Sequence, residues 1–80
     1  MSLDDAINDM KSKILAVSPG AQIKALKMSD EDARVTVLAP AGEMQAIKDA
    51  TFKPAIDYLN NEGYDIQVNV YDKDAPPLTG

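Results

Sequence analysis

The chain has 80 residues, enough for one domain with a modest hydrophobic core. It has no cysteine and no histidine, which excludes disulfides, thiol nucleophiles and cysteine-ligated clusters and removes the commonest general base and transition-metal ligand. Its 13 acidic and 8 basic residues give a formal net charge of -5, and the bases are spread along the chain, so nucleic acid and anionic membranes are disfavoured as partners.

The composition is that of a globular domain, with 45% apolar and 26% charged residues. No apolar run is long enough to cross a bilayer, and no signal-peptide core is present. We therefore expect a cytoplasmic protein without a membrane partner.

Residues 3–17 are expected to form the first helix. Ser2 and Asp5 have the spacing of a capping box, with Asp in place of the usual Glu or Gln. Apolar residues recur at steps of three and four, as in an amphipathic helix: Leu3, Ile7, Met10, Ile14 and Val17. The Ser-Pro-Gly sequence at residues 18–20 ends this helix, because proline lacks an N–H and glycine permits the turn.

Residues 21–28 and 33–39 are expected to form a β-hairpin. The second strand alternates clearly, with Val35 and Val37 on one face. The first is less regular, so that either a bulge lies near Ala25 or Leu26 and Met28 face the other side.

The turn between these strands contains three consecutive acids, Asp30, Glu31 and Asp32. They lack the alternate spacing and the glycine of a calcium-binding loop. We interpret them as a solvated turn and predict no metal site.

A Pro-Ala-Gly turn at residues 40–42 opens the second helical segment, which ends before Gly63. The segment carries two apolar stripes, one formed by Met44, Ile47, Thr51, Ala55 and Tyr58 and the other by Phe52, Ala55, Ile56 and Leu59. Because proline is unfavourable inside a helix, we expect either a kink at Pro54 or two helices, with Thr51 helping to cap the second.

Residues 64–71 alternate as a third strand, and the predicted order is α-β-β-α-β. We predict the α+β class: a two-layer α/β sandwich whose three-stranded mixed sheet carries both helices on one face. Residues 1–72 would form the domain, and residues 73–80, with two prolines, a flexible tail.

The sheet face opposite the helices is the predicted binding surface. Its side chains are expected to include Arg34, Thr36, Gln67, Asn69 and Tyr71. A three-stranded sheet also has unprotected strand edges, and edge-to-edge pairing is an inexpensive route to a homodimer. We therefore expect a protein partner or self-association.

The layout resembles one known family. Residues 3–7 (LDDAI) are similar to its acidic first helix, residues 20–23 (GAQI) to the Gly-Gly-Asp-Val that enters its first strand, and residues 51–59 (TFKPAIDYL) to its Thr-Leu-Lys-x-x-Ile-x-x-Leu helix. This is the iron–sulfur scaffold domain at the C-terminus of NifU-type proteins, and the resemblance covers residues 3–71. The family's Cys-x-x-Cys would fall on Gly42 and Gln45, neither of which binds iron, so the resemblance implies a fold without a cluster or other cofactor.

Catalysis is not expected, since serine and threonine have no histidine to activate them and the paired acids lie on an exposed turn. Lys53, beside Phe52, is the one lysine whose surroundings could make it reactive. The predicted function is a small non-catalytic interaction or assembly module that acts through the open sheet face or a strand edge.

Two alternatives remain. An RNA-binding KH-like domain would use two middle helices, although the junction at residues 50–54 lacks the GxxG loop. A small ligand or an anion could bind at the turn before the second helix, although Glu43 would repel an anion.

Overall fold

The computed structural model describes residues 1–74 of the chain. The elements follow in the order α1 (Leu3–Val17), β1 (Gln22–Lys27), β2 (Asp32–Ala39), the 3-10 turn η1 (Ala41–Glu43), α2 (Met44–Glu62) and β3 (Asp65–Asp72). Most of the tail predicted at residues 73–80 lies outside the described residues.

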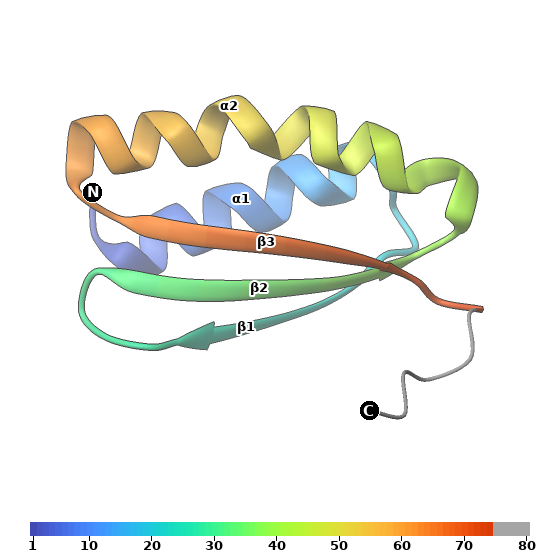
Figure 1. Ribbon diagram of the computed structural model, residues 1–80, viewed down its shortest axis with the longest axis horizontal. Coiled ribbons are helices and arrows are strands. Elements are labelled where there is room, and N and C mark those ends of the chain that lie inside the picture. Colours follow the sequence, from blue (N-terminus) through green and yellow to red (C-terminus); the bar gives the residue numbers. More distant parts are fainter. Residues whose placement is uncertain (75–80) are drawn as a thin grey trace.

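The strands form one mixed sheet in the order β1-β2-β3, with β1 antiparallel and β3 parallel to β2. Both helices lie on the same side of this sheet, α2 along β3 and α1 behind it (Figure 1). The predicted α+β architecture, with two helices over one face of a three-stranded mixed sheet, is therefore confirmed.

The hydrophobic core fills the space between the helices and the sheet. The alternating positions of β2 point into it, and Ala33, Val35, Val37 and Ala39 are buried. The other buried apolar residues come from the helices and β3: Leu3, Ala6, Ile7, Met10, Ile14, Ile47, Tyr58 and Ile66. The apolar residues that alternate along the strands and those that recur along the helices thus pack together in one core.

Helix α1 begins at the predicted capping box. The Asp5 N–H donates to the Ser2 hydroxyl at 3.1 Å, and the Ser2 N–H donates to the Asp5 carboxylate at 3.2 Å. The helix ends at Ser18, whose N–H donates to the Ile14 carbonyl at 2.9 Å. Ser18 is fully buried, and its hydroxyl donates to the Glu43 carboxylate at the start of α2.

The β1–β2 hairpin has a continuous register from Gln22 opposite Leu38 to Lys27 opposite Ala33. The irregular pattern of β1 is therefore explained by the second alternative, in which Leu26 and Met28 face away from the core. Their residue surfaces are 54% and 55% exposed.

At the end of β1, Lys27 has the same parity as the core-facing residues of this strand. Its ammonium lies 3.3 Å from the Asp4 carboxylate, in the first turn of α1. A charged side chain thus lies on the helix side of the β1 edge.

Helix α2 runs without interruption through Pro54, so the two-helix alternative is wrong. Thr51 does not cap a second helix, because its hydroxyl donates to the carbonyls of Ile47 at 2.8 Å and Lys48 at 3.3 Å. Ile47 and Tyr58 are buried on either side of the proline. Packing of both halves on one core holds the helix together despite the missing N–H.

Helix α2 ends at Gly63, whose φ of 75° and ψ of 16° give the left-handed cap predicted from the sequence. The chain then enters β3 directly. This turn sets α2 antiparallel to β3, and the helix lies over the strand along its length (Figure 1).

Candidate functional site

The five predicted binding residues lie on the sheet face that points away from the helices. The register of β2 and β3 places Arg34 beside Gln67 and Thr36 beside Asn69, and Tyr71 follows beside Leu38. The side chains therefore form a polar band across two strands, with Tyr71 44% exposed. Their role in binding stays a prediction.

The open face carries two small apolar groups among polar residues, Leu26 with Met28 and Leu38 with Tyr71. Leu26 stands opposite Arg34, and Leu38 lies between Gln22 and Tyr71. A shallow hollow of about 240 Å³ at one end is lined by Met28, Asp32, Ala33, Arg34, Asp65 and Gln67. Asp32 and Asp65, which are neighbours across β2 and β3, and Arg34 make this hollow a charged, solvated surface rather than an apolar contact site.

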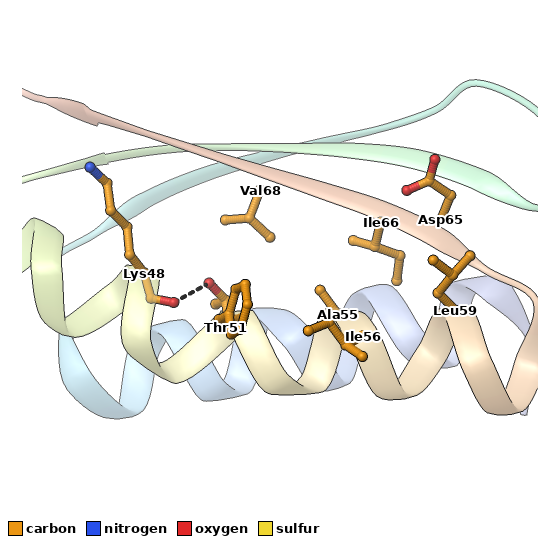
Figure 2. Close-up of a pocket in the computed structure, with 9 residues that line it drawn as sticks. Lys48, Thr51, Ala55, Ile56, Leu59, Asp65, Ile66 and Val68 are labelled. Atoms are coloured by element: carbon orange, nitrogen blue, oxygen red, sulfur yellow. Dashed lines mark hydrogen bonds between the residues drawn. The ribbon is translucent and has the colours of Figure 1, made fainter.

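A larger groove, of about 380 Å³, lies between α2 and β3. It is lined by Lys48, Thr51, Phe52, Ala55, Ile56, Leu59, Asp65, Ile66 and Val68. Figure 2 shows Lys48 at one end and the apolar side chains of Ile66 and Val68 pointing from β3 toward α2, whereas the Asp65 carboxylate points away from α2. The groove is therefore an apolar channel with a cation at one end.

Three large apolar side chains of α2 remain exposed along this groove. Phe52 is 69%, Ile56 40% and Leu59 51% exposed. They belong to the second apolar stripe of the helix, whereas Ile47, Thr51 and Tyr58 of the first stripe are buried. The first stripe covers the sheet, and the second extends past the outer edge of β3.

Among residues 1–74, no strand pairs with the side of β3 that faces away from β2, which we call the free edge of β3. The Asp65 N–H donates to the Glu31 carbonyl at 2.8 Å, and the Lys73 N–H donates to the Ala39 carbonyl at 3.0 Å, both on the β2 side. Amide groups alternate in direction along a strand, so those of residues 66, 68, 70 and 72 point to the free edge.

The residues with edge-facing amides are the same ones whose side chains face the helix layer. Ile66 is buried, and Val68 and Val70 pack against the core. The strand has eight residues and no proline, and its core-side positions from 66 to 70 carry no charge. Such an edge lacks the features that usually prevent pairing with another strand.

The other residues considered as metal-binding or reactive candidates are not brought together in the structure. Within residues 1–74, no three acidic side chains are grouped closely enough to hold a metal ion. The acids at residues 30–32 lie exposed on the hairpin turn, where Asp32 accepts a hydrogen bond from the Ser29 hydroxyl at 2.9 Å. Lys53 is exposed rather than enclosed by apolar side chains.

One carboxyl has a shifted pKa, and its cause is structural. Hydrogen bonds from the Ser2 backbone and then the Ser2 side chain lower the pKa of Asp5 below its ordinary value, with the nearby N-terminal charge acting in the same direction. Asp5 completes the cap of α1, so its shift reflects helix capping and not a reactive site.

The turn before α2 carries a negative charge. Glu43 is half-buried there and accepts the hydrogen bond from Ser18, while Gly42 is exposed. A carboxylate at the start of a helix is favourable to the helix dipole and competes with an anion for the same position.

Comparisons with protein-family models, with curated proteins and with solved structures find no match to this chain. The resemblance to the NifU-type scaffold domain therefore stays a prediction. In the part of the chain that the structure describes, no helix has the length and hydropathy needed to span a bilayer.

Proposed function

We propose that this chain is a non-catalytic protein-interaction module that adds a partner's strand to the free edge of β3. One observation carries the proposal: the exposed stripe of Phe52, Ile56 and Leu59 runs beside that edge. A strand placed there would form main-chain hydrogen bonds with β3 and cover the stripe with its side chains.

Both parts of this surface favour the same occupant. The amide groups of residues 66, 68 and 70 are spaced for a strand, and each exchanged hydrogen bond contributes about 0.5–1.5 kcal/mol net. Every second side chain of the added strand would enter the groove beneath Phe52 and Leu59. An alternating apolar segment is therefore the expected ligand.

The two alternative functions lack equivalent support. The KH-like reading depends on two middle helices with a loop between them, whereas α2 is one helix across Pro54. The anion reading depends on a turn that already presents the Glu43 carboxylate. Neither offers a surface comparable with the groove.

The proposal is tested by selecting strand-forming peptides from a random displayed library against the immobilised protein. Binders should share alternating apolar residues, lose binding to the Phe52→Lys variant and retain it to Leu26→Lys. Leu26 is the matched control because it is similarly exposed at 54% but lies on the opposite face of the sheet.

Amide chemical shifts then locate the bound peptide. The largest changes are expected at residues 66, 68 and 70. Peptides that shift Arg34, Thr36 and Asn69 instead would show that the open face binds, and binding of a random RNA pool at moderate salt would favour the KH-like alternative.

A further inference from the structure

We infer that the partner strand added to the free edge of β3 runs antiparallel to β3 and carries an acidic side chain at the Lys48 end of the groove. This inference rests on the proposed function and names the chemistry of its partner. In the partner's sequence, an acidic residue would be followed at every second position by apolar residues.

The exposed side chains of the groove are spaced to receive alternate residues of a strand. Lys48, Phe52 and Ile56 follow one another at steps of four residues along α2, which correspond to about 6 Å per step. Side chains on one face of a strand recur at about 6.8 Å. Successive groove-facing side chains of the added strand would therefore lie against Lys48, Phe52 and Ile56 in turn.

The β3 side of the groove determines which partner residue meets the lysine. Ile66 and then Val68 approach the Lys48 end of the groove along β3 (Figure 2). Val70 is the next residue of β3 that packs toward the core. Opposed residues of two paired strands have their side chains on the same face of the sheet. A partner residue opposite Val70 would therefore extend its side chain toward the Lys48 ammonium.

The charge of Lys48 has no close counter-charge in the described chain. Within residues 1–74, neither of the two ion pairs shorter than 4 Å includes Lys48. The neighbouring Asp49 accepts a hydrogen bond from the Gln45 side chain at 2.9 Å. Asp72, at the end of β3, accepts one from the Asp74 N–H at 2.9 Å. A carboxylate of the partner would supply the complementary charge.

This preference for an acid is confined to one position of the partner. The chain has a net charge of -5, so acidic residues elsewhere in a partner would be repelled. Beyond Lys48, the side chains that point into the groove are apolar except for Thr51, whose hydroxyl already donates to the Ile47 carbonyl. A carboxylate placed there would lose hydration without gaining a counter-charge.

The direction of pairing fixes the order of the motif. Strand β3 begins with Asp65, near the Leu59 end of the groove, and runs toward the Lys48 end (Figure 2). Antiparallel pairing is slightly more stable per residue than parallel pairing. An antiparallel partner enters at the Lys48 end, so its acidic residue precedes its apolar residues.

The library selection, repeated on two charge variants, tests the inference. Binders of the unchanged protein should be enriched in Asp or Glu two residues before their first groove-facing apolar residue. Lys48→Glu should change this preference to Lys or Arg. Lys53→Glu is the matched control, because Lys53 is exposed on the same helix but is not among the groove residues, and its binders should keep the acid. Circular dichroism should show both variants folded.

Titration of a single peptide measures the size of the preference. The probe is the peptide TETVTVTVT, acetylated and amidated so that it has no terminal charges, and amide chemical shifts of the protein report its binding. Replacing its Glu by Gln should raise the dissociation constant about threefold, and replacing it by Lys about tenfold, as expected for a surface ion pair and for a like-charge contact. Lys48→Glu should reverse this order. The peptide with the reversed sequence should bind more weakly than TETVTVTVT.

The outcomes separate this inference from the proposed function. If neither library peptides nor TETVTVTVT bind, both fall. If peptides shift the amides of residues 66, 68 and 70 without a charge preference, or with one that Lys48→Glu leaves unchanged, the inference falls and the proposed function stands. Tighter binding of the reversed peptide also overturns the inference. A preference that switches in Lys48→Glu and not in Lys53→Glu supports both.

Sedimentation equilibrium of the full chain tests the other possible occupant of the edge. A dimer that Phe52→Lys disrupts and Leu26→Lys does not would mean that a second copy occupies the β3 edge, and would overturn the inference. A monomer that binds the acidic peptide supports it.

Discussion

The Tyr58 hydroxyl on α2 donates a hydrogen bond to Oδ2 of Asp9 on α1. The Lys13 ammonium lies 2.7 Å from the same oxygen. Tyr58 is only 7% exposed, so its ring belongs to the core while its hydroxyl joins the two helices at the edge of that core. The helix layer is therefore fixed by a polar contact as well as by apolar packing.

The Tyr58→Phe variant is expected to unfold at lower urea concentration. It keeps the ring in the core and removes the hydrogen bond to a charged acceptor, at a cost of about 1–2 kcal/mol in the free energy of unfolding. Tyr64→Phe is the matched control, because the Tyr64 hydroxyl donates to the Met1 carbonyl at an exposed site. An equal loss in both variants would contradict the importance of the interhelical contact.

The Ser18→Ala variant should lose about 1 kcal/mol, since it removes the donor to half-buried Glu43 from a fully buried position. Ser12→Ala provides the comparison, because the exposed Ser12 hydroxyl donates to the Asn8 carbonyl within α1. Alanine is the better helix former there, so Ser12→Ala should keep or raise stability. Urea titrations of both variants measure the difference.

The Pro54→Ala variant should stabilise the protein by about 2 kcal/mol, somewhat less than the intrinsic cost of a proline inside a helix. Alanine restores an N–H that can donate to the Ala50 carbonyl, while the half-buried ring contributes some packing that is lost. Pro19→Ala, in the turn after α1, should give no such gain. A fall in stability for Pro54→Ala would mean that the ring is needed for packing.

The Asp5→Asn variant should show a pH-dependent effect. The folded-state pKa of Asp5 is lowered, so its contribution to stability is complete above the unfolded-state pKa and is lost as the pH falls through the folded-state pKa. The urea midpoints of the two proteins should therefore differ at neutral pH and converge in acid. A difference that is constant over this range would contradict the assignment.

Much of the fold could be predicted because local signals agree with the tertiary structure. The capping box at Ser2, the alternation of Val35 and Val37 and the left-handed cap at Gly63 each depend on residues close in sequence. The continuity of α2 through Pro54 could not be predicted, because it depends on the packing of Ile47 and Tyr58 against residues far along the chain.

The candidate site was only partly predictable. Its strand edge and its second helical stripe, Phe52 to Leu59, are both visible in the sequence. Whether that stripe is covered depends on strand order, because a further strand beside β3 would have buried it. Strand order is fixed by long-range packing rather than by any local pattern, so the groove could be identified only from the structure.

The two margins of the sheet differ in one respect. At the β1 edge the Lys27 ammonium lies 3.3 Å from the Asp4 carboxylate of α1, and a charged side chain at a strand edge opposes pairing with another strand. We therefore expect a further strand to pair with the β3 edge of the sheet and not with the β1 edge. A concentrated solution should reach a fixed particle size and stay clear instead of forming fibrils.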